Sequence, residues 1–303
     1  MKRIALVTTR AARALDDDFG PLADALSAAG AEASAVDWGD PGADWHAFDA
    51  AVLRATWDYT ERLAEFLGWA ERASAATRLL NPLPLVRWNT DKHYLAELAG
   101  AGVPCVPGRF VEPGMDAAAA LAGFLEGEGA DAVEFVVKPA IGAGSRDARR
   151  HARGQVAQAI THIGRLLGER RSVLLQPYLA SVDTQGETAM MFFDGAFSHA
   201  IRKGALLRPG EASTEALFAA EDIAPRPPTP MEHALARRAL AALPAHLLEQ
   251  GAPLYARVDL IQAADGMPRL LELELTEPSL FFAHGAGSAD RCAAALLRRL
   301  VKE

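Results

Sequence analysis

The feature that most constrains this sequence is a predicted β-hairpin near its C-terminal end, over residues 255–275. Within it, the dipeptide Asp265-Gly266 favours a two-residue turn between two extended runs. Because directly opposed residues share one face of a sheet, this turn places four charged side chains on the same face, in the pairs Asp259–Glu272 and Arg257–Glu274. The opposite face is then apolar and carries Val258, Leu271, Leu273 and Leu275.

Three carboxylates on one face repel one another unless a cation lies among them. Hard oxygen ligands suit Mg²⁺, which also binds water and phosphate oxygens. The pattern therefore predicts one or two Mg²⁺ ions, with Mn²⁺ as an alternative ion, at Asp259, Glu272 and Glu274. The alternative is a solvated strand face that happens to carry charges, and alternation by itself does not decide between the two.

Composition excludes several classes of function. With 303 residues, 50% of them hydrophobic, the chain can bury cores for two or three subdomains. Its net charge of −8 argues against a nucleic-acid surface. No apolar stretch approaches the roughly 20 residues that span a bilayer. We expect a cytoplasmic protein with a small-molecule substrate and no membrane partner, a homo-oligomer being left open, and we expect Cys105 and Cys292 to be buried.

Lysine is rare in this chain. Of the 31 basic residues only five are lysines, at positions 2, 92, 138, 203 and 302. Arginine is thus the usual surface cation, and the three interior lysines mark places where a compact point charge is suited, for instance to phosphate oxygens. Chance placement of three surface lysines is the alternative.

Residues 1–88 are predicted to form an α/β domain. Strands and helices alternate there, with strands at 4–7, 33–38, 49–54 and 79–81 and helices at 21–29 and 61–76. This order predicts a parallel sheet whose ligand edge lies beyond the carboxyl ends of its strands.

Two further domains are expected, at 89–180 and 181–303. The first is an α+β unit with strands at 107–111, 135–138 and 173–176 and helices at 91–101, 116–128 and 154–167. The second contains a hairpin at 188–203, an irregular or mobile loop over 208–230, helices at 231–248 and 288–301, and the charged hairpin.

Two segments of the middle region suggest a nucleotide. A strand ending at Lys138 is followed by a loop that contains Gly142, Gly144 and Ser145, and its backbone N–H groups can surround phosphates. The spacing is neither that of a Walker loop nor that of a Rossmann fingerprint, and an ordinary turn is the alternative.

The second segment is Gln176-Pro-Tyr178-Leu179, where a proline ends a strand and frees backbone groups that a flat base can use. Glu187 follows a turn glycine and could accept two hydrogen bonds from a ribose. A buried strand entering a turn and an exposed glutamate are the alternatives, so each motif is weak by itself.

The order of these motifs resembles the ATP-grasp superfamily from about residue 85 to the end. It runs from Lys92 through the Lys138 loop and Glu187 to the Arg-x-Asp and Glu-x-Glu of the final hairpin. The resemblance implies an ATP-grasp fold, α/β and α+β, preceded by a parallel-sheet preATP-grasp domain, with residues 105–180 moving as a lid. One departure is Glu274, where the superfamily commonly has Asn.

The resemblance also implies roles for single residues. Lys92, Lys138 and the loop with Gly142, Gly144 and Ser145 would hold ATP phosphates, Gln176, Tyr178 and Leu179 the adenine, Glu187 the ribose, and Asp259, Glu272 and Glu274 the metal. Arg257 would stabilise the transferring phosphoryl group or the oxyanion, and Lys203 would complete the phosphate site.

Within the superfamily the chain is most similar to small bacterial ligases of the D-cycloserine-forming and glutathione-synthetase-like kinds. The similar segments are Leu53–Tyr59, Asn81-Pro82 with Arg87–Lys92, and Phe197–His199 before Arg202-Lys203. At the end of its predicted strand, Arg54 would bind a substrate carboxylate or carbonyl and Asp58 an ammonium, beside Thr56, Trp57 and His199. Structural aromatics and a structural histidine are the alternatives.

The expected activity is that of an ATP-dependent ligase. A substrate carboxyl group would become an acyl phosphate, which an amine-type nucleophile attacks, so that two molecules are joined or a ring is closed on a small amino-acid derivative. A non-catalytic nucleotide-binding regulator is one alternative. A nicotinamide-dependent oxidoreductase is another, although the segment 8–11 after the first strand lacks the required glycines.

Overall fold

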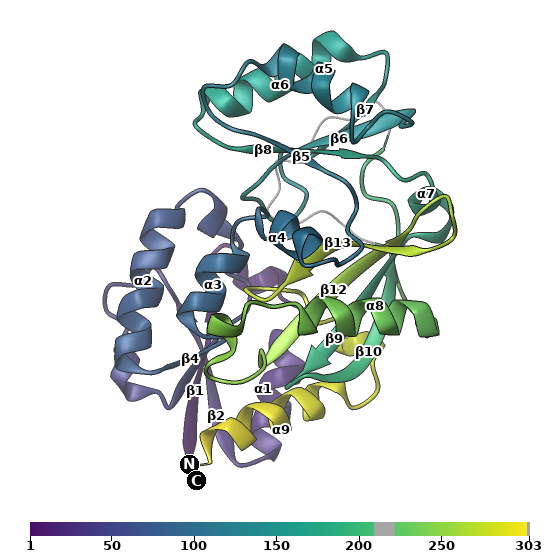
Figure 1. Ribbon diagram of the computed structural model, residues 1–303. Coiled ribbons are helices and arrows are strands. Elements are labelled where there is room, and N and C mark those ends of the chain that lie inside the picture. Colours follow the sequence, from purple (N-terminus) through teal and green to yellow (C-terminus); the bar gives the residue numbers. More distant parts are fainter. Residues whose placement is uncertain (209–221, 302–303) are drawn as a thin grey trace.

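The computed structural model describes residues 1–208 and 222–301. Three β-sheets follow one another along this part of the chain. The first and third sheets lie beside each other at one end of the molecule, and the second sheet with its two helices lies at the other end (Figure 1). The domain boundaries at 1–88, 89–180 and 181–303 stay a prediction, and each sheet lies within one of these ranges.

The first sheet is parallel, as predicted, with strand order β2-β1-β3-β4. Its side chains alternate between two separate cores. Ile4 and Leu6 pack with helix α1, whereas Ala5 and Val7 pack with helix α2 and its aromatic residues. Covering on both faces explains why the strands are continuous apolar runs. The elements are β1 (Lys2–Thr8), α1 (Phe19–Ala28), β2 (Ala31–Asp37), β3 (Ala50–Leu53), α2 (Leu63–Ala76) and β4 (Arg78–Leu80).

Between the first and second sheets lie two short helices, α3 (Leu83–Asn89) and α4 (Tyr94–Gly100). The sequence predicts one helix at 91–101, and α3 was not predicted. Prolines at 82 and 84 suggested a break, but Pro82 precedes the helix and Pro84 lies in its first turn, where a backbone N–H is not needed.

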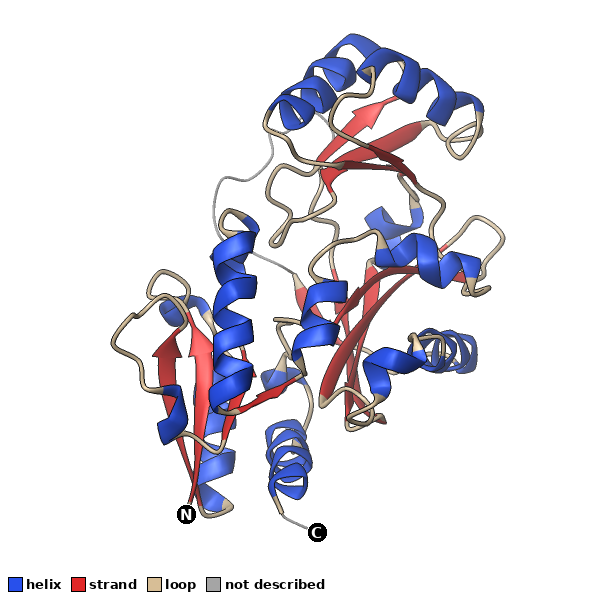
Figure 2. Cartoon of the chain, turned by 60° about the vertical axis from the view of Figure 1, so that its left-hand side comes forward, coloured by secondary structure: helices blue, strands red, loops and turns tan. Residues whose placement is uncertain are grey.

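The second sheet is antiparallel, with strand order β5-β8-β6-β7. Two helices cover one of its faces (Figure 2). Strand β7 was not predicted, because its consecutive arginines gave no apolar pattern. The elements are β5 (Arg109–Val111), α5 (Ala117–Glu126), β6 (Glu134–Pro139), β7 (Arg149–Ala152), α6 (Val156–Gly168) and β8 (Val173–Pro177).

The third sheet is also antiparallel, with strand order β11-β10-β9-β12-β13. Helix α8 packs against β12 and β13, and α9 packs against β9, β10 and α1. The elements are α7 (Ser181–Gln185), β9 (Glu187–Phe193), β10 (Ala196–Lys203), β11 (Ile223–Pro225), α8 (Pro230–Ala241), β12 (Tyr255–Gln262), β13 (Pro268–Glu274) and α9 (Ser288–Leu300).

Two predictions in this region need correction. The expected loop at 208–230 lies partly outside the described residues, and its described part contains the edge strand β11, which pairs with β10. The helix predicted at 231–248 ends at Ala241, and a separate 3-10 turn follows at Ala245–Leu248 after Pro244. A proline favours extended backbone in the residue before it, which explains the break. Cys292 is buried and Cys105 only partly so.

The charged hairpin has the predicted partners but not the predicted turn. Ala263 donates to the carbonyl of Met267, so the loop contains three residues and Gly266 has a φ of +77°. A bulge between Asp259 and Leu260 shifts the register back. Asp259 therefore still faces Glu272, and Arg257 still faces Glu274. The bulge also turns Leu271 toward the cavity described below, which corrects its predicted place in the apolar face.

Among the helices of the described residues, none has the length and apolar run needed to cross a membrane.

A buried histidine pair joins β7 to α6 in the second sheet's core. The ring nitrogens of His151 and His162 are 3.4 Å apart, and Phe135 stacks on His151. Burial lowers the pKa of both histidines to about 4. The unfolded chain therefore binds protons below pH 6.5 that the folded protein does not.

We expect the free energy of unfolding to fall between about pH 6.5 and 4, by up to roughly 1.4 kcal/mol per pH unit for each histidine. Urea denaturation at a series of pH values measures this slope. The double variant His151→Phe/His162→Leu should have a smaller slope, whereas His46→Gln, on an exposed side chain, should not change it. A slope unaltered in the double variant would contradict the assignment.

Candidate active site

A single cavity collects nearly all the residues that the motifs predicted. It lies between the three sheets, and its wall includes the glycine loop after β6 and the charged face of the β12–β13 hairpin. The predicted residues that line it are Trp57, Lys92, Lys138, Gly142, Gly144, Ser145, Gln176, Tyr178, Leu179, Glu187, Lys203, Arg257, Asp259, Glu272 and Glu274.

Buried asparagines hold the hairpin in place at the cavity floor. Asn81 donates to the carbonyls of Tyr255 and Leu275, at 2.9 and 2.8 Å, and accepts from the amide of Leu254. Asn89, at the end of α3, donates to the carbonyl of Leu273 at 2.7 Å and accepts from Leu275. These contacts fix the two charged strands relative to the segment after β4.

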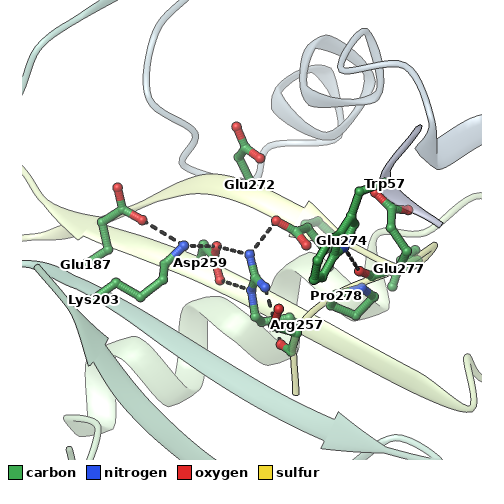
Figure 3. Close-up of polar contacts among 12 residues, drawn as sticks. Trp57, Glu187, Lys203, Arg257, Asp259, Glu272, Glu274, Glu277 and Pro278 are labelled. Atoms are coloured by element: carbon green, nitrogen blue, oxygen red, sulfur yellow. Dashed lines mark hydrogen bonds and ion pairs between the residues drawn. The ribbon is translucent and has the colours of Figure 1, made fainter. Parts of the chain in front are cut away.

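Acidic and basic side chains alternate along the cavity floor (Figure 3). The Lys203 Nζ atom lies 3.0 Å from Glu187 and 2.6 Å from Asp259. Arg257 donates to both oxygens of Asp259, at 2.9 Å each, and also contacts Glu274. Burial opposes ionisation of Asp259, but Arg257 and Lys203 lower its pKa. Burial raises the pKa of Glu274. Arg257 lowers this pKa, but the negative charges of Asp259 and Glu272 raise it further, so the net shift is upward.

The second sheet contributes a lysine to the same floor. Lys138, near the end of β6, donates to Glu272 at 2.7 Å, and Lys92 lies 3.9 Å from the same carboxylate. Burial opposes ionisation of Glu272, but Lys138 and Lys92 outweigh it and hold its pKa well below the usual range. Lys92 also donates to the carbonyl of Gly142 at 2.8 Å, which ties it to the glycine loop.

The far end of the cavity is more apolar. Val106, Val182, Ile261 and Leu271 cluster there with Tyr178 and Leu179. The guanidinium of Arg150 lies 3.6 Å from the centre of the Tyr178 ring, which fixes that ring. Gly186 has a φ of +71° and closely approaches the carbonyl of Lys203, so a side chain there would clash and Glu187 is brought to the cavity rim.

Of the predicted substrate residues, only Trp57 lines the cavity. Thr56 is fully buried. Asp58 accepts from the Trp38 indole at 2.9 Å and faces Arg62. The imidazole of His199 is 2.9 Å from the carbonyl of Leu280 and packs against Gly285, as a structural histidine does.

Arg54 is also placed outside the cavity lining. Its guanidinium is buried, lying 3.2 Å from Asp16 and 3.1 Å from Asp18, and it donates to the carbonyl of Pro278. Asp18 in turn accepts the backbone amides of residues 280, 281 and 282, at 2.6, 3.1 and 2.8 Å. Arg54 therefore holds the loop that follows β13.

That loop brings residues to the cavity that the sequence analysis did not identify. Glu277 and Ser279 line it, together with Tyr59 from the first domain's 3-10 turn. The Trp57 indole donates to the carbonyl of Glu277 at 3.3 Å, and Arg257 donates to that of Ser279 at 3.2 Å. Burial and the charge of Glu274 raise the pKa of Glu277 to about 8. A carboxylate in an irregular loop has no periodic signal in the sequence.

Comparison with known proteins agrees with this geometry. A family model described as the N-terminal domain of D-cycloserine synthetase DcsG matches residues 4–81. The cycloserine biosynthesis protein DcsG of Streptomyces lavendulae is 45% identical over 304 residues, covering 98% of each chain. The chain belongs to the DcsG family.

A solved structure of this family and those of other ligases confirm the predicted ATP-grasp fold. The crystal structure of D-cycloserine synthetase DcsG has a TM-score of 0.91 and 44% identity, covering 99% of this chain and 100% of that one. ATP-grasp ligase PsnB has a TM-score of 0.62 and 20% identity, covering 98% and 97% of the two chains. D-alanine–D-alanine ligase from Bacillus anthracis has a TM-score of 0.66 and 15% identity, covering 99% and 97%.

These comparisons decide between the predicted classes of protein. The chain is an ATP-dependent ligase with the ATP-grasp fold, and the regulator and the nicotinamide-dependent oxidoreductase were the wrong alternatives.

Replacing Arg54 tests its observed role. We expect Arg54→Met to lower the free energy of unfolding by about 3–5 kcal/mol, because two buried carboxylates lose their cation. The matched control is Lys2→Met, which removes a partly exposed surface ion pair with Asp49 and should cost no more than about 1 kcal/mol. Urea denaturation measures both. Wild-type stability combined with lost substrate affinity would instead support the direct substrate contact predicted from the sequence.

Proposed function

We propose that this enzyme closes the ring of D-cycloserine, or of a close analogue, by forming a C–N bond at the expense of ATP. The observation that carries the proposal is the row of paired charges from Glu187 to Glu274, contributed by strands of the third sheet and met by Lys138 from the second. The 45% identity to DcsG over nearly the whole chain supports the choice of product.

The chemistry of the product defines the substrate class. The ring of D-cycloserine contains an amide bond between the carboxyl carbon of a serine skeleton and a nitrogen carried by the serine oxygen. The open precursor is thus an O-amino-D-serine or a derivative of it. Its carboxylate is a poor electrophile and has to be activated before the nitrogen can attack.

Activation by ATP takes place in two steps. The carboxylate oxygen attacks the γ-phosphorus, ADP leaves, and an acyl phosphate forms. The substrate nitrogen then attacks the carbonyl carbon, the bond from that carbon to the phosphate oxygen breaks, and phosphate leaves while the nitrogen loses its proton to solvent. Arg257 is the group suited to stabilise the oxyanion of this second step, because its guanidinium lies among the cavity acids and is held in place by Asp259.

The lysines and the glycine loop suit the phosphates of ATP. Lys138 and Lys92 are compact ammonium groups beside that loop, and phosphate oxygens would compete with Glu272 for them. The apolar end, with Gln176, Tyr178 and Leu179, suits the adenine, and Glu187 suits the ribose.

The donors also fit Mg²⁺ in type. Asp259, Glu272 and Glu274 are three carboxylates on one strand-pair face, and a bound Mg²⁺ would neutralise both their charge and that of the phosphates. In the described residues no three acidic, histidine or cysteine side chains converge as they stand. Each of the three carboxylates is instead paired with a lysine or an arginine, and phosphate oxygens would compete for the lysines.

Ring closure is tested by ADP release and by the mass of the product. With O-amino-D-serine, ATP and Mg²⁺, we expect ADP and a product lighter than the substrate by one water. ADP release that requires two substrate molecules, with a product of their joint mass less one water, would overturn ring closure in favour of intermolecular ligation.

Removing one metal-binding charge should reduce turnover. Glu272→Gln is expected to lower kcat by about 100-fold or more, since such electrostatic contributions reach several kcal/mol. Glu65→Gln, in an exposed ion pair with Arg62, is the matched control. Nearly normal turnover in a folded Glu272→Gln protein would contradict the metal assignment.

Removing a lysine should weaken ATP binding. We expect Lys138→Ala and Lys92→Ala each to raise the Kd for ATP by about 10-fold to 100-fold, the usual range for a hydrogen bond to a charged group. Isothermal titration calorimetry measures this, with Lys2→Ala as the control on a partly exposed lysine outside the cavity. Unaltered affinity in both variants would rule out the phosphate site.

A further inference from the structure

Glu277 is a cavity acid for which the proposed reaction has no role so far. It follows β13 and is 8% exposed. It lies beside Trp57, past Glu274 at the end of the charged row (Figure 3). Its backbone is held from two sides, because Trp57 donates to its carbonyl and Arg257 donates to the carbonyl of Ser279. The Glu277 carboxylate also has a hydrogen bond with the Tyr59 hydroxyl, so its side chain is held as well as its backbone.

Glu277 differs from the other four cavity acids in its partners. Glu187, Asp259, Glu272 and Glu274 each form an ion pair with a lysine or an arginine. Within residues 1–208 and 222–301, no basic side chain forms such a pair with Glu277. A buried carboxylate beside a like charge is unfavourable unless a cation binds it or it takes up a proton.

We propose that Glu277 binds the ammonium group of an amino-acid substrate. This inference rests on the proposed function, since it assigns a substrate contact in the same cavity. The carboxyl group to be activated has to lie near Arg257, and Arg257 contacts the backbone only two residues beyond Glu277. In an α-amino acid the ammonium nitrogen is two bonds from the carboxyl carbon, so one substrate can reach both groups.

The surroundings of Glu277 suit an ammonium group. Trp57 and Tyr59 also line this end of the cavity, and aromatic rings attract cations. Glu277 thus takes the role that the sequence analysis predicted for Asp58, whose carboxylate is engaged by Trp38 and Arg62 outside the cavity.

The consequence is selectivity for substrates that carry an α-amino group. A ligand without it leaves the Glu277 carboxylate with the neutral Tyr59 hydroxyl but without a cation. A hydrogen bond between charged groups is commonly worth about 10-fold to 100-fold in affinity. We therefore expect the wild-type enzyme to bind O-amino-D-serine about 10-fold to 100-fold more tightly than 3-(aminooxy)propanoate, which differs only by lacking the α-amino group.

The experiment is a calorimetric titration of both compounds in the presence of ADP and Mg²⁺, so that it does not depend on turnover. Glu277→Gln keeps the shape of the side chain and should reduce the difference between the two compounds to about twofold or less. Glu277→Asp keeps the negative charge and should retain part of the difference in affinity between the two compounds. Glu65→Gln, outside the cavity, should retain the whole difference.

Three outcomes would overturn the inference. They are equal wild-type affinity for the two compounds, undiminished selectivity in Glu277→Gln, and no wild-type binding of either compound. Because the first comparison uses only the wild-type protein, it holds even where a variant does not fold. Retained ammonium selectivity without ring closure would overturn the proposed product alone, whereas ring closure without the selectivity would overturn the role of Glu277 alone.

Discussion

The structure depends on one constraint, which is that the charges buried on the β12–β13 hairpin have to compensate one another. Arg257 lies between Asp259 and Glu274, and Lys203 lies between Asp259 and Glu187. A buried charged side chain without a partner of opposite charge would lower the stability of the folded protein. Their partners come from different elements: Lys203 from β10 and Lys138 from the second sheet, where it reaches Glu272. Of these pairs, Lys138–Glu272 also connects the second sheet to the third across the cavity.

A second set of buried polar contacts controls the loop after β13. Asp18 accepts three consecutive backbone amides there, and Arg54 neutralises Asp18 while binding the carbonyl of Pro278. An irregular segment has no ladder of backbone hydrogen bonds, so side chains have to satisfy its buried amides. Arg54 and Asp18 both belong to the N-terminal domain. That domain therefore shapes the cavity by holding this loop, although it provides little of the cavity wall. Trp57 and Tyr59 are the side chains that it contributes directly.

Much of the fold was predictable because its periodicity is strong. The parallel first sheet, the second sheet's helices and the hairpins follow from apolar patterns and glycine turns. The errors lie where local signals mislead: Pro84 hid α3, and Arg149 and Arg150 hid β7. The hairpin is instructive, because the predicted pairing of Asp259 with Glu272 is right although the turn is one residue longer. A bulge between Asp259 and Leu260 shifts the strand register by one residue and so offsets the longer turn. No pattern in the sequence predicts this bulge.

The sequence by itself determined the type of fold, the charged hairpin and the interior lysines, because each depends on local alternation or on residue type. Only the tertiary structure decided which acids and bases are partners. Arg54 lies just beyond a strand that ends toward the ligand edge, as predicted, yet its side chain turns to Asp16, Asp18 and Pro278. Glu277 lies in an irregular loop and nevertheless lines the cavity. The direction of a polar side chain depends on partners that can be more than 200 residues away in sequence, such as Arg54 and Pro278, and only folding brings them together.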